Sequence, residues 1–181
     1  MFDPATLWDA HCEPVPQMMR YDWSDTRMLL SDVGLSSGCR PGTMILTKDG
    51  ELPVEYLVPG DMVITRDRGY APLVRVERFR RIAHAIRFVL PAERTSASHS
   101  QVVLPGFQQV YIRDDRAKVM TGKDSAMIRA DALVDGEFIT DLGMTKLELY
   151  ALRFASEHVI YANGLEIASG PAKAAVLRGV A

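Results

Sequence analysis

Short runs of apolar residues, separated by turn-forming residues, dominate the chain from Thr43 onward. The runs are rich in β-branched and aromatic side chains, which favour strands. Gly, Pro, Asp and Asn cluster between them, which is typical of turns. The expected strands are TMILT (43–47), DMVITRD (61–67), LVRVERF (73–79), IRFVL (86–90), QVVLP (101–105), QVYIR (109–113) and HVIYA (158–162). Many short strands at close spacing predict an all-β fold rather than alternating βα units.

The two ends of the chain differ from this β region. Asp3 is a typical N-cap and Pro4 a typical first helical residue, so a short helix is expected from about Pro4 to Ala10, with a second helical turn ending at Gly34. The SSG segment before Cys39 predicts a flexible joint. We therefore expect a partly helical segment over 1–38, a β domain over 39–169, and a tail over 170–181 with a short helix from about Pro171.

One sequence pattern occurs twice. LVPGDMVIT (57–65) returns as LVDGEFIT (133–140), with Gly60 matching Gly136 and Asp61 matching Glu137. Two copies are too few for a solenoid. They indicate either two related halves about a pseudo-twofold axis, or independent use of a common turn that leads into a buried strand.

Composition and charge narrow the classes of partner. The chain has 181 residues, of which 48% are hydrophobic and 24% charged, and a formal net charge of −2. This balance gives no electrostatic reason to expect nucleic acid or an anionic membrane as partner. The basic run Arg75–Arg87 is accordingly interpreted as a solvated strand edge. The sequence shows neither a secretory signal nor a run of about 20 apolar residues, so a cytoplasmic location is the default expectation.

Metal and cofactor sites are not expected. The chain has two cysteines, Cys12 and Cys39, and four histidines, without the short ligand spacing of a zinc site. It also has no Gly-rich phosphate loop and no Gly-x-Ser-x-Gly turn.

The pair Gly38–Cys39 is the strongest candidate for chemistry. A cysteine thiol can attack the carbonyl carbon of the preceding residue and convert the peptide bond into a thioester. The reaction needs an activated thiol and a proton for the departing nitrogen. Glycine suits the position before the cysteine. Because it has no Cβ, its backbone can adopt strained angles and the thiol can approach its carbonyl carbon. A single cysteine is nevertheless more often a packed core residue.

The flanks of Cys39 carry a family resemblance. The segment GCRPGTMILTKDGELPVEYLVPGDMVITRD (38–67) resembles the opening of Hint (Hedgehog/intein) domains, in particular the bacterial stand-alone branch. HVIYANGLEIAS (158–169) is similar to the closing segment of that family. The resemblance implies an all-β Hint fold of two pseudo-symmetric halves and self-processing chemistry started by Cys39, and it favours duplication as the origin of the repeated turn.

The family histidine that protonates the scissile nitrogen has two candidate positions here. By spacing to the segment MIRADALVDG (127–136), the position is Gln108, whose amide donates hydrogen bonds but transfers no proton near neutral pH. By residue type, SASH (96–99) matches the Thr/Ser-x-x-His motif and gives His99, at the expense of an irregular insertion. Spacing favours Gln108, and His99 is otherwise a loop residue.

The closing segment also departs from the family. The His-Asn pair with which inteins release the downstream chain corresponds to Ala168 and Ser169, so splicing is not expected. Asn163, the only asparagine, lies in an Asn-Gly pair that is a common tight-turn signal. His158 could orient or protonate groups near the junction, or form an ordinary surface pair beside Glu157. The family often has Tyr-Asp where this chain has Tyr150 and Ala151.

Two functional hypotheses follow. In the first, Cys39 performs an N-to-S acyl shift at Gly38–Cys39, and the domain cleaves off its N-terminal segment without splicing, at an impaired rate and in a single turnover. In the second, the Hint fold has lost its chemistry and serves as a structural or protein-binding module. The expected partner is the chain's own N-terminal segment, as substrate or packing partner, or another protein. Nucleic acid and membrane are not expected partners.

Overall fold

The computed structural model describes residues 37–90 and 101–172. The expected helices before Gly34 and the alternative histidine position, His99, lie outside these ranges. The described strands form two sheets, with the orders β2-β1-β3-β10-β11-β7-β8 and β12-β9-β5-β6, and β4 pairs with β3. The prediction of an all-β fold is confirmed.

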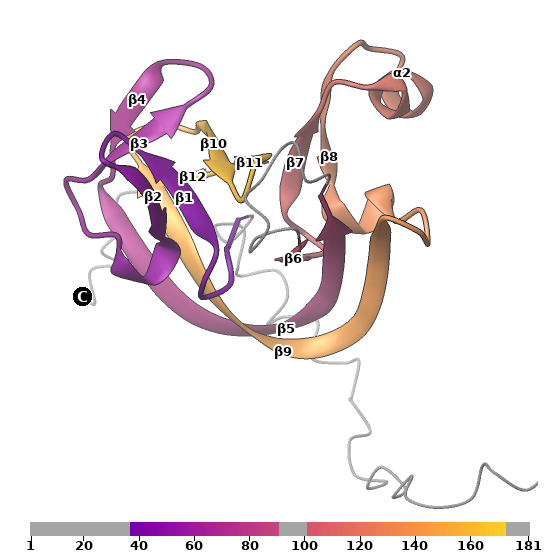
Figure 1. Cartoon of the computed structure of the whole chain (residues 1–181), viewed down its shortest axis with the longest axis horizontal. Helices are drawn as coiled ribbons and strands as arrows, with labels where there is room; N and C mark the ends of the chain where they lie inside the picture. The colour runs from indigo at the N-terminus through magenta and orange to yellow at the C-terminus, as the bar shows by residue number, and fades with distance from the viewer. Residues whose placement is uncertain (1–36, 91–100, 173–181) are drawn as a thin grey trace, which may run out of the picture. The chain divides into compact units, whose positions relative to one another are not determined.

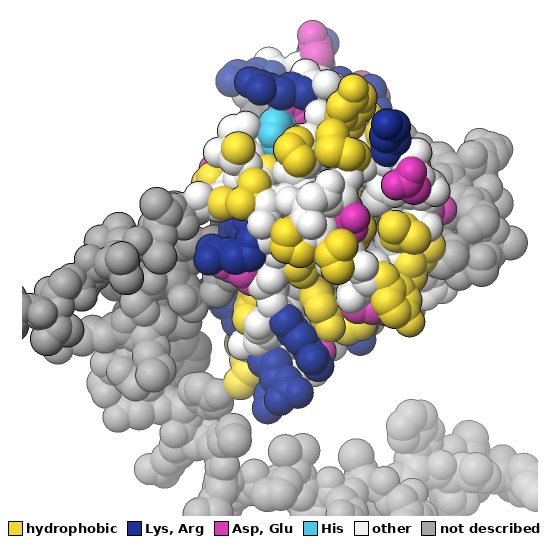
Figure 2. Space-filling view, turned by 90° about the vertical axis from the view of Figure 1, so that its left-hand side faces the viewer, with side chains coloured by type: hydrophobic (Ala, Val, Ile, Leu, Met, Phe, Trp, Pro, Cys, Tyr) yellow, Lys and Arg dark blue, Asp and Glu magenta, His cyan; other side chains and the backbone are white. Residues whose placement is uncertain are grey.

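The first half of the β region is built from short hairpins. The elements are β1 (Met44–Thr47), β2 (Gly50–Pro53), the 3-10 helix η2 (Val54–Tyr56), β3 (Met62–Thr65) and β4 (Gly69–Pro72). Residues of β1 and β3 alternate between half-buried and buried positions, as expected for strands with one face on the core. Figure 2 shows apolar side chains among basic ones on the side of the molecule where Figure 1 places β2 and β4.

Two long strands form the base of the other sheet. β5 (Arg75–Val89) and β9 (Ile139–Phe154) pair antiparallel over almost their whole length, from Arg75 opposite Arg153 to Phe88 opposite Ile139. A bulge between His84 and Ile86 interrupts the register, and both strands bend strongly in Figure 1. The two strands expected over 73–79 and 86–90 are thus parts of one strand. No strand was expected over β9.

The second half repeats the hairpin pattern of the first. β6 (Gln101–Pro105) pairs with β5, and β7 (Gln109–Ile112) pairs with β8 (Ala126–Arg129). Between β7 and β8 lies the helix α2 (Asp115–Thr121), capped by the Asp114 side chain and ended by Gly122 at φ 73°. The 3-10 helix η4 (Ala130–Leu133) then leads into β9.

The repeated sequence pattern has the same local structure in both copies. Each follows a 3-10 helix, turns at a glycine with positive φ (Gly60 at 101°, Gly136 at 81°) and enters a strand. Leu57 and Leu133 are both buried at corresponding positions. The side chain that accepts backbone hydrogen bonds in the turn differs. Asp61 accepts from Val58 N–H in the first copy, and Asp135 accepts from Ile139 N–H in the second. Backbone course is thus shared by the two copies, whereas the polar contacts are not.

A closing hairpin joins the two halves. β10 (Val159–Ala162) pairs with β1, β3 and β11 (Leu165–Ala168), and β11 pairs with β7. Core residues come from both sheets, and the largest fully buried apolar ones are Phe154, Ile45, Leu73, Ile86, Leu104, Leu149, Ile160 and Ile167. Gly170 and Pro171 form β12, parallel to β9. Pro171 thus belongs to a strand, and the rest of the tail helix expected from about this residue lies outside the described residues.

Candidate functional site

The peptide bond between Gly38 and Cys39 lies against the C-terminal part of β9. Cys39 N–H donates to the carbonyl oxygen of Tyr150 at 2.9 Å, and Tyr150 N–H donates to the Cys39 carbonyl oxygen at 2.8 Å. This isolated bridge fixes the backbone of Cys39 as if it were a strand residue. The nitrogen that must leave in an acyl shift is therefore hydrogen-bonded to a carbonyl, which accepts a proton and has none to give.

The Cys39 thiol is deeply buried. The residue is 3% exposed and belongs to the main apolar core. Burial raises its pKa to about 12, because a thiolate loses its hydration in apolar surroundings. At pH 7 only about one thiol in 10⁵ is then ionised, and the thiolate is the nucleophilic form. Cys39 is thus packed in the core, as a single cysteine usually is, and it is also the residue that would act as nucleophile.

Gln108 connects the Gly38–Cys39 junction to the closing hairpin. It immediately precedes β7 and is fully buried. Its Oε1 accepts a hydrogen bond from Gly38 N–H at 2.8 Å, and its Nε2 donates to the carbonyl oxygens of Gln109 and Ala168 at 2.9 Å each. All the polar atoms of the amide are therefore engaged, and the side chain reaches the junction through the nitrogen of Gly38, one residue before the scissile nitrogen.

Gly38 is tightly enclosed. A Cβ at this position would lie 3.2 Å from Cβ of Leu149 and 3.2 Å from Cζ of Phe79. Any larger residue would have to push these core side chains aside. Among the described residues, no hydrogen bond is donated to the Gly38 carbonyl oxygen. The junction is thus held in place, but within 37–90 and 101–172 no group donates a hydrogen bond where an oxyanion would form.

A buried arginine beside the junction was not foreseen from the sequence. Arg153 is 3% exposed, and its Nε donates to Glu77 at 2.7 Å. A Cβ at position 170 would overlap its guanidinium and would lie 3.6 Å from Oγ of Ser37, so Gly170 brings these groups together. The Ser37 hydroxyl is buried without a hydrogen-bond partner in the described chain. The ion-pair partners are 76 residues apart in sequence, and no local pattern points to them.

Ser169 and His158 are hydrogen-bonded to each other at the open end of the closing hairpin. Ser169 N–H donates to the His158 carbonyl oxygen at 2.8 Å, and His158 N–H donates to Ser169 Oγ at 3.1 Å. The serine hydroxyl thus substitutes for a backbone group where β10 begins. It extends the pairing of the hairpin by one residue.

The imidazole of His158 is buried and oriented by a carboxylate. The side chain is 4% exposed, and Nδ1 lies 2.7 Å from Oδ2 of Asp67. Nε2 lies 3.2 Å from Oγ of Ser156, and the ring packs edge-on against Phe154. The interpretation of His158 as a surface residue paired beside Glu157 is therefore wrong, because the paired acid is Asp67, 91 residues away in sequence.

Asn163 has a structural environment. It lies between β10 and β11 at φ 48°, a left-handed conformation that asparagine tolerates better than most residues. Its Oδ1 accepts a hydrogen bond from Met44 N–H, and its own N–H donates to the Met44 carbonyl oxygen at 2.8 Å. The tight-turn interpretation is confirmed. These contacts connect Asn163 to β1 rather than to Gly38 or Cys39.

A family model identifies the family to which this fold belongs. The family model for the Hint domain matches residues 38–170, which is most of the chain. The protein belongs to the Hint domain family. No curated protein sequence matches the chain.

Solved structures resemble the fold of this Hint domain. The bacterial intein-like domain from Clostridium thermocellum is 13% identical, and the match covers 74% of this chain and 98% of that one with a TM-score of 0.50. A DnaB intein from Synechocystis sp. PCC 6803 is also 13% identical, over 74% of this chain and 99% of that one, with a TM-score of 0.46. The first likeness supports the fold alone.

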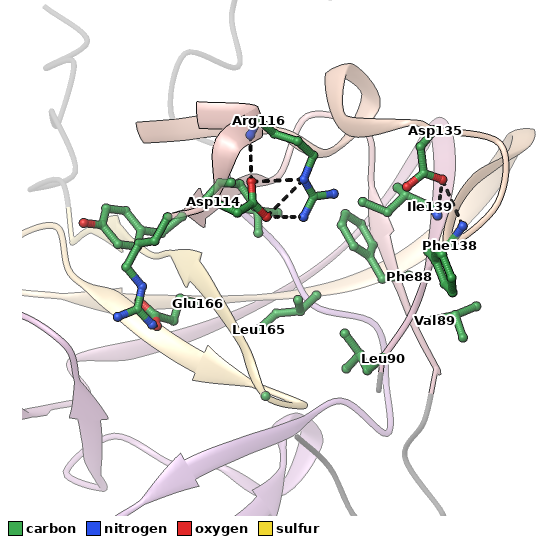
Figure 3. A pocket seen from close by; sticks show the side chains of 15 residues that line it. Phe88, Val89, Leu90, Asp114, Arg116, Asp135, Phe138, Ile139, Leu165 and Glu166 are labelled. Carbon is green, nitrogen blue, oxygen red and sulfur yellow. Dashed lines mark hydrogen bonds and ion pairs between the residues drawn. The ribbon is translucent and has the colours of Figure 1, made fainter. Parts of the chain in front are cut away.

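The Hint domain also carries an open groove of about 910 Å³, lined by the end of β5, β7, β11 and the loop before β9. Phe88, Leu90 and Leu165 contribute apolar surface, and the ion pair between Asp114 and Arg116 lies at its edge (Figure 3). The groove therefore combines an apolar floor with a charged edge, as ligand and peptide sites commonly do.

None of the helices within 37–90 and 101–172 has the length and apolar character needed to cross a bilayer. Within the same ranges, no group of three or more His, Cys, Asp or Glu side chains is arranged to hold a metal ion.

Proposed function

We propose that this Hint domain is a slow self-processing domain that cleaves the chain at Gly38–Cys39 without splicing. The observation that carries the proposal is that the backbone is fixed on both sides of that peptide bond, since Cys39 N–H donates to Tyr150 and Gly38 N–H donates to Gln108. A fixed backbone around the junction restricts the motion of the thiol relative to the carbonyl, and such restriction lowers the barrier of an intramolecular attack even where acid–base groups are weak.

The proposed reaction proceeds in two steps. Sγ of Cys39 attacks the carbonyl carbon of Gly38, the bond from that carbon to the Cys39 nitrogen breaks, and the nitrogen takes up a proton. Water or an external thiol then attacks the resulting thioester, which frees residues 1–38 and regenerates the Cys39 thiol. The N-terminal segment is thus the substrate, and each chain turns over once.

Two features of the junction support a slow rate. Burial raises the Cys39 pKa to about 12, so very little thiolate is present at neutral pH. In addition, the side chain that reaches the junction is the Gln108 amide, which is no general acid. A positioned acid typically contributes about 10² to 10⁴ in rate, and its loss slows cleavage by a similar factor.

The end of the domain supports cleavage without splicing. Ser169 stands where inteins carry the asparagine that cyclises, and a serine hydroxyl cannot form the cyclic imide. Asn163, the only asparagine, is committed to a turn and to Met44.

Mass spectrometry of the intact chain tests the proposal. The full chain and Cys39→Ala are incubated at pH 8 with excess thiol or with hydroxylamine, and the products are weighed over days. We expect the wild type to release a fragment ending at Gly38 and Cys39→Ala to stay intact. If both keep the intact mass equally, the proposal is wrong.

The groove favours a second candidate function, that of a Hint fold that has lost its chemistry and binds another protein. Its apolar floor and charged edge suit a peptide segment with apolar side chains. The intact mass result separates the two functions, since a binding module needs no cleavage. Under the second function, Leu165→Glu would abolish partner binding without changing the intact mass of the chain.

The location and the remaining partners stay predictions. We propose a cytoplasmic protein that acts on its own N-terminal segment. The net charge of −2 supports the proposal that neither nucleic acid nor a membrane is a partner. No cofactor or metal has a part in the proposed reaction.

A further inference from the structure

A second nucleophile with a positioned base lies where β3 ends and β10 begins. Asp67 follows β3, and Ser156 and His158 belong to the connection from β9 to β10. Oδ2 of Asp67 lies 2.7 Å from Nδ1 of His158, and Nε2 of His158 lies 3.2 Å from Oγ of Ser156. The imidazole thus bridges a carboxylate and a serine hydroxyl, one on each ring nitrogen.

The protonation pattern of this set follows from the carboxylate. Partial burial acts to raise the pKa of Asp67, but hydrogen bonds from His158 and from backbone N–H groups outweigh it and the net pKa is lowered. Asp67 is therefore ionised at neutral pH and can only accept, so Nδ1 of a neutral His158 carries the proton. Nε2 is left with a lone pair facing the Ser156 hydroxyl.

The base is buried and the nucleophile is exposed, as a nucleophilic site requires. The His158 side chain is 4% exposed and packs against Phe154, so its ring is fixed. Ser156 lies in an exposed loop and is open to a substrate from solvent. No described residue accepts a hydrogen bond from the backbone N–H of Ser156 or Glu157, which leaves donors at the loop for a developing oxyanion.

We propose that Ser156, His158 and Asp67 form a nucleophile–base–carboxylate triad that reacts with small uncharged carboxylic esters. Nucleophile and base within hydrogen-bond reach, with the base oriented by a third group, define this class of site. Oγ of Ser156 forms a bond to the acyl carbon and its proton passes to Nε2 of His158. The ester C–O bond then breaks and the departing alkoxide takes that proton. Water reverses the sequence and releases the acid.

The proposal is independent of cleavage at Gly38–Cys39, because neither Gly38 nor Cys39 takes part. The test incubates the full chain with p-nitrophenyl acetate at pH 7.5 and locates acetyl groups by peptide mapping. Ser125, a half-buried serine in the turn before β8, is the control, and Cys39 falls in a different peptide. We expect Ser156 to be acetylated at least about tenfold faster than Ser125, and Asp67→Asn to slow this by about tenfold or more.

Substitution of the serines completes the test. Ser156→Ala should remove the acetylated peptide and the initial release of p-nitrophenol, whereas Ser125→Ala should leave both unchanged. Circular dichroism checks that Asp67→Asn stays folded. Equal acetylation of Ser156 and Ser125, or a Ser156 rate unaffected in folded Asp67→Asn, would overturn the proposal.

Discussion

The Cys39 junction has a strong nucleophile without a base beside it, whereas the Ser156 loop has a weak nucleophile with a base beside it. Cys39 is intrinsically the better nucleophile, but it is buried, and the nearby side chain is the amide of Gln108. Ser156 is the weaker nucleophile, but an imidazole oriented by Asp67 faces its hydroxyl. The difference teaches that a nucleophile is defined by its surroundings: burial withdraws the cysteine, whereas a base can activate the serine.

The first effect that sharpens this comparison is the pH dependence of cleavage at Cys39. Since its pKa is raised to about 12, the thiolate fraction increases tenfold per pH unit across the neutral range. We expect the cleavage rate to rise about hundredfold from pH 7 to pH 9, measured by intact mass with the Cys39→Ala background subtracted. A rate that levels off below pH 9 would show an ordinary thiol and would remove the contrast between the two sites.

The same raised pKa has a consequence for stability. Because the folded-state pKa exceeds the unfolded value of 9.0, the contribution of the neutral Cys39 thiol is fully present below pH 9 and is lost as the pH rises towards 12. Rates should therefore be compared at or below pH 9, where the domain keeps this contribution.

The next largest effect concerns the strength with which Gln108 holds the junction. Gln108→Ala leaves the buried N–H of Gly38 and the part-buried carbonyl oxygens of Gln109 and Ala168 without their partner. We expect the free energy of unfolding to fall by about 3 kcal/mol in urea titration. Gln109→Ala is the matched control, since Gln109 is exposed, and should change it by less than about 0.5 kcal/mol. Similar losses in the two variants would contradict a structural role for Gln108.

A smaller effect is expected at the turn of the closing hairpin. Asn163→Ala loses the hydrogen bond to Met44 and places alanine at a positive φ, so we expect about 2 kcal/mol of destabilisation in thermal or urea unfolding. Asn163→Asp keeps an acceptor and tolerates the same backbone, and it should stay within about 0.5 kcal/mol of the wild type. A cleavage defect in folded Asn163→Asp would assign Asn163 a chemical role after all.

The smallest effect is expected at the carboxylate of the Ser156 site. The pKa of Asp67 is lowered from 3.8, so its pairing stabilises the fold above that pH and is lost as the pH falls through the folded-state value. Asp67→Asn should therefore be slightly less stable than the wild type at pH 6, and the two unfolding curves should converge below about pH 3.8. A gap that widens in acid would show that the sign of this coupling is wrong.

Local sequence patterns predicted β1, β3, β6, β7, β10 and parts of β5, but neither the short strands β2, β4, β8 and β11 nor the longest strand, β9. The segment of β9 contains Leu147, Glu148 and Ala151, which are residue types that favour helices, and a glycine at 143. It is a strand because almost every residue pairs with β5, a contact that local propensity does not encode. The repeated turn was visible because its glycines and buried leucines recur at fixed spacing.

Residues of the candidate site could be predicted from the sequence only where a motif with fixed spacing indicates their position. Spacing indicated Gln108, and the structure brings it to Gly38 as a hydrogen-bond partner. The pairing of Asp67 with His158 and that of Glu77 with Arg153 span 91 and 76 residues. Such contacts are set by the way β3, β5, β9 and β10 come together, so one sequence without its fold cannot reveal them.

The most direct test of the account is the cleavage rate of Gln108→His at pH 7. Histidine at this position places a titratable acid beside the junction, and we predict a rate about 10² to 10⁴ times that of the wild type. Cys39→Ala in the same background should abolish cleavage, and circular dichroism should show an unchanged fold. A folded Gln108→His that cleaves no faster than the wild type would contradict the claim that a missing proton donor limits this Hint domain.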